Sequence, residues 1–140
     1  MNYLVSLDTG AGELEKILSG TKSMLAKEFD PAQSAEQLVR PGDSLYFLRE
    51  KDEGAVRVKA TVVRVLPTEE CSDEDLSHLL KELQPRLQLT EEQYNYWSAK
   101  QRMLLVEFDS AQKITVIHIA SKKITDHSDW IPFEEFSLIT

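Results

Sequence analysis

Apolar and polar residues alternate most clearly between residues 55 and 66. Within this stretch Val56, Val58, Ala60 and Val62 alternate with Arg57, Lys59 and Thr61. A period of two predicts a strand with one buried face and one wet face. The neighbouring valines Val62 and Val63 interrupt the period, which indicates a bulge or burial on both faces.

Several other short stretches also read as strands. Residues 44–48 are apolar and aromatic and follow a Pro-Gly-Asp turn at 41–43, so they predict the hairpin partner of 55–66. Residues 3–7, 23–29, 103–108 and 114–119 predict four more strands. Residues 130–133 form a further apolar patch, and Pro132 within it excludes a central strand.

Helical periodicity occurs in three places. Residues 13–19 place Leu14, Ile17 and Leu18 on one face, and Gly20 is the expected stop. Ser72 is a good N-cap for a second helix, which we expect to end at Pro85. Thr90 starts a third helix with a partial capping box. The apolar stripe of the second helix consists of Leu76, Leu79, Leu80 and Leu83.

These elements predict the α+β class. The specific expectation is a small, partly closed antiparallel β-barrel with a helix after the first strand and a helical insert before the later strands. We find no linker, repeat or low-complexity tract, so residues 1–140 are expected to form a single domain.

Charge and cysteine content narrow the range of functions. The formal net charge is −8, and residues 69–92 carry eight acids against Lys81 and Arg86. The remainder is nearly neutral, so the acidity argues against non-specific nucleic-acid binding only weakly. The single cysteine, Cys71, excludes an internal disulfide, and no apolar run is long enough to span a membrane. We therefore expect a cytoplasmic protein that does not associate with membranes.

A short motif resembles a known family. The run Ile17-Leu18-Ser19-Gly20-Thr21-Lys22-Ser23 is similar to the Ile-Leu-x-Gly-x-Lys-Thr/Ser signature of ASCH domains, which belong to the PUA-like superfamily. Gly42-Asp43 and Val106-Glu107-Phe108 fall where that family has a turn and a final strand, so the resemblance covers about residues 12–108. Residues 110–140 resemble the extra strands of larger PUA-like relatives.

The resemblance implies a cleft beside Lys22 that binds RNA or a modified nucleotide. Other cations are expected to join Lys22 as phosphate contacts. This set consists of Lys27, Arg40, Arg57, Lys59 and Arg64. From the residues alone, each of them can equally be a solvated lysine or arginine on the wet face of a helix or strand.

Two alternatives remain open. Some ASCH proteins are amidohydrolases that act on acylated cytidine with a Lys, a Thr and a Glu. Lys22 matches the Lys and would be the catalytic residue of such an enzyme, but Leu25 stands at the Thr position and Glu82 is an ambiguous match for the Glu. This departure favours a binding module over an enzyme. The acidic segment 69–92 is also suited to docking a basic protein.

The remaining chemistry-bearing residues suggest no cofactor and no metal. The three histidines His78, His118 and His127 lack a regular ligand spacing, and the Asp-His-Ser-Asp run at 126–129 is not a triad by sequence proximity. Tyr94, Tyr96 and Trp97 can stack on a base or anchor the core, and the helical spacing favours the core. The sequence leaves the oligomeric state open.

Overall fold

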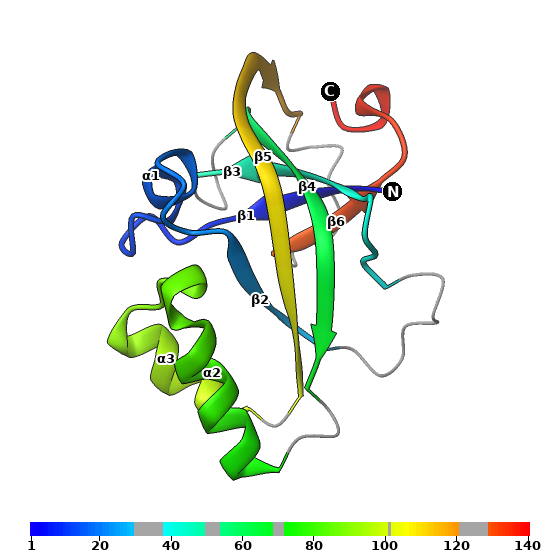
Figure 1. Ribbon diagram of the computed structural model, residues 1–140. Helices are drawn as coiled ribbons and strands as arrows, with labels where there is room; N and C mark the ends of the chain where they lie inside the picture. Colours follow the sequence, from blue (N-terminus) through cyan, green and yellow to red (C-terminus); the bar gives the residue numbers. More distant parts are fainter. Residues whose placement is uncertain (30–37, 50–53, 69–71, 101, 121–128) are drawn as a thin grey trace.

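The computed structural model describes residues 1–29, 38–49, 54–68, 72–100, 102–120 and 129–140. Six strands, three α-helices and a short 3-10 helix follow one another along these residues (Figure 1). They are β1 (Asn2–Ser6), α1 (Glu13–Leu18), β2 (Met24–Glu28), β3 (Ser44–Leu48), β4 (Ala55–Pro67), α2 (Asp73–Leu87), α3 (Glu91–Ser98), β5 (Met103–His118), β6 (Trp130–Phe133) and η3 (Phe136–Leu138). The helix after the first strand and the helical insert before the later strands are confirmed.

The strands form one mixed sheet in the order β2-β5-β4-β3-β1-β6. β1 runs parallel to β3, and every other neighbouring pair is antiparallel. The α+β barrel-like class is therefore confirmed, but the expectation of a purely antiparallel sheet is wrong. The chain between β1 and β3 includes α1 and β2, which is long enough for the crossover that a parallel pair requires.

The sheet curls into a half-barrel that brings its two edge strands together. Lys27 on β2 lies with its Nζ atom 5.9 Å from the centre of the Trp130 ring on β6. Pro132 lies on β6, which is an edge strand. This agrees with the sequence prediction, because a proline has no N–H to donate to a neighbouring strand. Trp130 also packs edge-on against Tyr3 of β1, with ring centres 5.9 Å apart.

Three apolar clusters stabilise this arrangement. The largest fills the inside of the curl and includes Val5, Leu45, Phe47, Val58 and Phe108. A second lies between α2 and the outer face of β2 and β5. A third lies on the outer face of β1 and β3, where the C-terminal residues Phe136 and Ile139 cover it. Both faces of the sheet are thus buried in places, which explains why the period-two pattern breaks.

β4 confirms the predicted bulge and corrects one detail of the alternation. The pairing with β5 shifts register between Val62 and Arg64, and Val63 is exposed. A further shift falls between Val56 and Val58. Val56 consequently packs in the outer cluster, whereas Val58 packs inside the curl. The prediction that both valines share one buried face is wrong, because a bulge reverses the facing of the residues before it.

β5 is one long strand, although the sequence predicted two. The two predicted strands left residues 109–113 between them, and within this stretch Ser110 adopts a left-handed backbone with φ 57°. The strand continues because β4 supplies hydrogen-bonding partners on both sides of this point, with Thr61 opposite Asp109 and Lys59 opposite Gln112. Exposed polar side chains do not prevent a backbone from pairing.

The helix boundaries follow the predicted caps with one exception. The Ser72 hydroxyl accepts the Asp75 N–H, and Thr90 and Gln93 form a complete capping box. The prediction that Pro85 ends α2 is wrong, because the helix runs on to Leu87 and is capped by Gln88 with φ 50°. A proline in the last turn removes a single backbone hydrogen bond, and the complete burial of Leu87 favours the extra residues.

Some sequence-based expectations lie outside the described residues. Cys71, His127 and most of the predicted loop between residues 49 and 54 belong to these positions. Within the part of the chain that the structure describes, no helix combines the length and apolarity needed to span a membrane.

The curled sheet predicts different responses to charge at neighbouring positions of β4. Val58→Asp should destabilise the protein severely, because it places an unpaired carboxylate in the inner cluster, where Val58 is 1% exposed. Lys59→Asp should cost about 1 kcal/mol or less, which is the scale of the cation–π contact that the half-buried Lys59 makes with Tyr46. Thermal unfolding followed by circular dichroism measures both, and equal melting temperatures would contradict the assigned facing.

Candidate functional site

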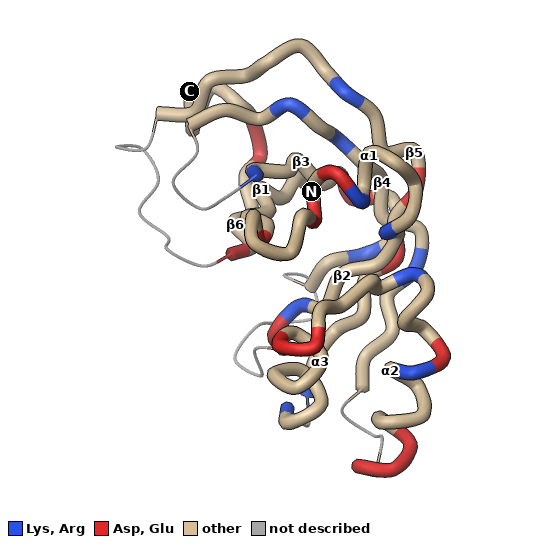
Figure 2. Tube along the Cα trace, turned by 90° about the vertical axis from the view of Figure 1, so that its left-hand side faces the viewer, with Lys and Arg blue, Asp and Glu red and all other residues tan. Residues whose placement is uncertain are grey.

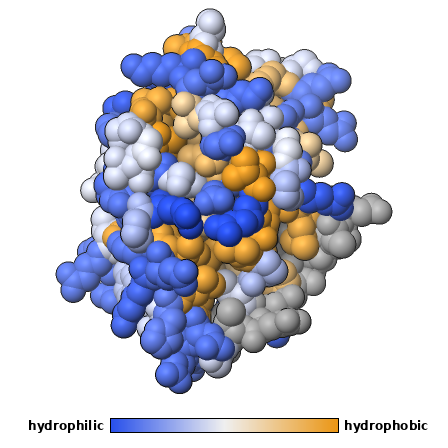
Figure 3. All heavy atoms as spheres, viewed as in Figure 1, coloured by the Kyte–Doolittle hydropathy of each residue, from blue (hydrophilic) through white to orange (hydrophobic). Residues whose placement is uncertain are grey.

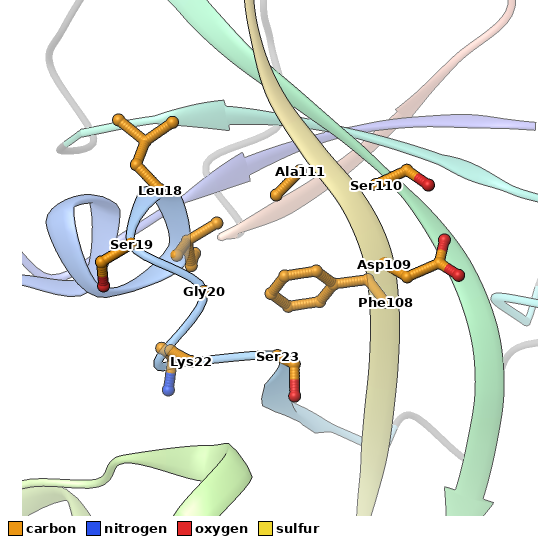
Figure 4. A pocket seen from close by; sticks show the side chains of 10 residues that line it. Leu18, Ser19, Gly20, Lys22, Ser23, Phe108, Asp109, Ser110 and Ala111 are labelled. Atoms are coloured by element: carbon orange, nitrogen blue, oxygen red, sulfur yellow. The ribbon is translucent and has the colours of Figure 1, made fainter.

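A pocket of about 340 Å³ lies where the C-terminal end of α1 meets the middle of β5. In Figure 4, Phe108 and Ala111 point from β5 toward α1, whereas Asp109 and Ser110 point to the other side of the strand. The pocket therefore has an apolar wall on β5 and a rim of hydroxyl and backbone groups on the α1 side. Its lining consists of Ile17, Leu18, Ser19, Gly20, Lys22, Ser23, Phe108, Asp109, Ser110 and Ala111.

Local backbone geometry creates the opening. Gly20 adopts φ 81°, which ends α1 and turns the chain toward β2. No heavy atom lies within 4 Å of the position that a Cβ on Gly20 would take, so the space beside this residue is open. On the other side, the left-handed Ser110 bends β5 next to the pocket. The ASCH-like signature thus forms one side of the pocket.

Lys22 does not occupy the position expected for it. The sequence predicted a solvated cation facing the cleft, but Lys22 is 1% exposed. Its Nζ atom donates a hydrogen bond to the Leu87 carbonyl and lies 3.6 Å from Glu13 Oε2. Figure 4 shows the side chain directed away from the pocket, toward α2. Lys22 is buried because the C-terminal carbonyls of α2 need hydrogen-bond donors and its ammonium group supplies one.

The surroundings of Lys22 change its protonation equilibrium. Burial lowers the pKa of its ammonium group, while the nearby carboxylate of Glu13 partly opposes this by favouring the charged form. The partner Glu13 is itself buried and accepts hydrogen bonds at Oε1 from the Asp8 N–H and from Gln93, each at 3.1 Å. The pair is therefore part of a hydrogen-bonded network.

This network connects α1 to the junction between α2 and α3. Lys16 donates to the carbonyl of Gln88 at 3.3 Å, one residue beyond the carbonyl that Lys22 contacts. Gln93, which completes the capping box of α3, is the residue that reaches Glu13. Two lysines and one glutamine from separate elements thus fix the angle between the helices and the pocket.

The other predicted cations lie in separate parts of the molecule (Figure 2). Arg40 is exposed near Tyr3, where its charge partly offsets the rise in the tyrosine pKa caused by burial and by Asp43. Lys27 lies over Trp130 at the edge of the curl, and Lys59 lies over Tyr46 on the outer face. Arg57 is exposed on β4. The fold therefore does not gather these side chains around Lys22 as one cluster.

The aromatic residues of α3 divide between packing and surface contacts. Tyr94 and Trp97 pack against the cluster beneath α2, as the helical spacing favoured. Tyr96 is exposed and donates to Glu28 on β2, which also accepts from Lys100 at 2.8 Å. The hydrogen bonds from Lys100 and then Tyr96 lower the pKa of Glu28. These contacts attach α3 to the end of β2.

The residues that the enzyme hypothesis requires are not brought together. Leu25 packs inside the curl with 6% exposure, and Glu82 is exposed on α2. Neither lines the pocket. Among the described residues, no group of three His, Cys, Asp or Glu side chains could hold a metal ion.

Sequence reasoning missed the roles of Glu13, Arg86 and Gln93. Glu13 precedes Ile17 by four residues and so borders the buried face of α1, which was a usable signal for a buried acid. Arg86 follows Pro85, at which the sequence predicts the end of the helix. The contact of Gln93 with Glu13 joins residues 80 apart in the chain, and no local pattern reveals such a contact.

Comparison with known proteins supports the fold. No protein-family model matches the chain, and no curated protein does. The ASCH protein from Zymomonas mobilis is similar in structure, with a TM-score of 0.62 and 17% identity over 84% of this chain and 73% of that one. A DUF984-family protein from Enterococcus faecalis V583 has a TM-score of 0.52 and 15% identity, covering 81% of each chain. The protein therefore has the ASCH fold, as the signature predicted.

The buried position of Lys22 predicts a structural effect of its removal. Lys22→Met should lower the free energy of unfolding by about 3–5 kcal/mol, because Glu13 and the Leu87 carbonyl lose their charged partner. Lys113→Met is a matched control at an exposed position of β5 and should change stability by about 0.5 kcal/mol or less. Urea unfolding measures both. Two variants of equal stability would show that the buried network does not stabilise the fold.

Proposed function

We propose that this protein binds RNA or a modified nucleotide and that the pocket between α1 and β5 receives the base. The observation that carries the proposal is the position of the pocket, which opens at the ASCH-like signature in a chain with the ASCH fold. Fold similarity alone does not establish function, and the chemistry of the pocket lining supports the proposal as well.

The lining of the pocket suits a nucleobase. Its volume of about 340 Å³ is at the small end of ligand pockets, which fits a single heterocycle. Ala111 and Leu18, which are partly exposed, supply apolar surface for the faces of a ring, and Ser19 and Ser23 supply hydroxyls for its edge. Bases that are unpaired in single-stranded RNA present both kinds of surface.

The remaining predicted cations fit a more peripheral role in this proposal. Arg57 and Lys59 lie along β4 and would contact phosphates only in an RNA that extends beyond the pocket. Lys27 and Arg40 would contact such an RNA near Trp130 and Tyr3. Lys22 supports binding indirectly, because it ties the segment after α1, which lines the pocket, to the C-terminal end of α2.

Filling the pocket should abolish binding without unfolding the protein. Ala111→Phe places a ring in the space between β5 and α1, so the affinity for a short single-stranded RNA should fall at least about tenfold, the equivalent of 1.4 kcal/mol. Val116→Phe makes a comparable enlargement at an exposed site on the same strand and should leave the affinity unchanged. Fluorescence anisotropy measures binding, and unaltered affinity in Ala111→Phe would exclude the pocket as the base site.

The geometry predicts no hydrolysis of acylated cytidine. The ammonium group of Lys22 is held by the Leu87 carbonyl and Glu13 away from the pocket, and Leu25 offers no hydroxyl for attack. Chromatography of N-acetylcytidine incubated with the purified protein should therefore detect no cytidine above background. Turnover that Ala111→Phe eliminates and Val116→Phe retains would overturn this and favour the amidohydrolase alternative.

A further inference from the structure

Two arginines share one carboxylate beside the pocket. Arg64 on β4 lies with Nε 3.4 Å from Glu107 Oε1, and Arg86 on α2 lies with Nε 3.6 Å from Glu107 Oε2. Both arginine side chains are about half exposed, at 45% and 52%. One carboxylate neutralises one guanidinium, so this cluster carries a net positive charge within a chain whose overall charge is −8.

Backbone hydrogen bonds connect this cluster to residues that line the pocket, although its three side chains lie outside the lining and Glu107 faces the α2 side of β5, opposite to Phe108. The Ser23 N–H donates to the Arg86 carbonyl at 3.0 Å, and the Phe108 N–H donates to the Ser23 carbonyl at 3.0 Å. Ser23 and Phe108 both line the pocket, and Glu107 directly precedes Phe108. Figure 3 shows strongly hydrophilic side chains over the middle of β5, between the upper part of the sheet and α2.

The geometry of the two ion pairs leaves guanidinium N–H groups of both arginines able to bind a further anion. In each pair the nitrogen nearest to Glu107 is Nε, so the terminal nitrogens of the guanidinium are not the atoms closest to the carboxylate. A guanidinium held in one orientation can offer its terminal N–H groups to two oxygens of a phosphate. Because Glu107 restrains both side chains beforehand, less conformational entropy is lost when an anion binds.

We propose that Arg64 and Arg86 together bind the phosphate of a nucleotide whose base occupies the pocket. The natural ligand is then a phosphorylated nucleotide or an RNA strand, and a free nucleoside lacks the group that this cluster recognises. This inference rests on the proposed function of the pocket. The two ion pairs contribute little to the stability of the fold, since exposed ion pairs are worth about 0–1 kcal/mol.

Salt dependence of RNA binding tests the proposal directly. The double variant Arg64→Gln/Arg86→Gln should bind a ten-nucleotide single-stranded RNA of mixed sequence at least about tenfold more weakly. The slope of log affinity against log salt should decrease by about 0.7, because the two arginines bind one phosphate and each neutralised phosphate of a single strand contributes about that much. Arg102→Gln is the matched control. It changes an exposed arginine five residues before Glu107, roughly 17 Å along the strand.

A comparison of ligands separates this inference from the proposed function. Titrations followed by NMR with the four nucleosides and with their 5′-monophosphates should show tighter binding of the monophosphates by the wild type. The double variant should lose that advantage and keep the nucleoside affinity, whereas Ala111→Phe should lose both. Arg64→Lys/Arg86→Lys keeps the charge and should retain most of the salt slope, which guards against a folding defect in the glutamine variant.

The outcomes that overturn the inference are specific. If the glutamine double variant keeps the wild-type affinity and salt slope while Ala111→Phe abolishes binding, the pocket proposal stands and the phosphate site is wrong. If RNA binding tolerates Ala111→Phe, the proposed base site fails and the linked phosphate site fails with it.

Discussion

The contact of Lys22 with Glu13 and the Leu87 carbonyl is the interaction on which the surroundings of the pocket depend. It joins the segment after α1 to the C-terminal end of α2 in a place from which water is excluded. An unpaired buried charge is costly, so the three groups are stable only together. The relative position of α1 and α2 is therefore fixed by electrostatics as well as by apolar packing.

The contacts of Lys22 position both parts of the proposed binding site, which are the arginine cluster and the pocket. Arg86 is the residue before Leu87, so the carbonyl that holds Lys22 also fixes the helical turn from which Arg86 extends to Glu107. Gly20, two residues before Lys22, forms the open side of the pocket. Lys22 is thus placed to hold residues of the proposed binding site in position although it is itself buried.

The acids at the start of α2 do not oppose the binding of a phosphate at Arg86, because they are separated from it in space. The exposed acids Asp73, Glu74 and Asp75 lie at the start of α2, and Arg86 lies in its last turn. At about 1.5 Å per residue these ends are roughly 18 Å apart, whereas the screening length at physiological salt is about 8 Å. An anion at Arg86 is therefore largely shielded from those acids, and they remain available to a basic partner.

The sequence by itself determined the elements, their caps and the fold class. Alternation identified β4, apolar and aromatic content after a turn identified β3, Ser72 and Thr90 marked helix starts, and the signature around Gly20 predicted the ASCH fold. These features depend on neighbours within a few residues, which a chain displays directly. The parallel pairing of β1 with β3, the continuity of β5, the extension of α2 past Pro85 and the burial of Lys22 were decided by tertiary structure. Each depends on a partner that is distant in the chain: β4 for the middle of β5, the apolar cluster around Leu87 for the end of α2, and a helix carbonyl 65 residues away for Lys22. Local sequence shows that a lysine can donate a hydrogen bond, but only the folded chain decides which acceptor it reaches.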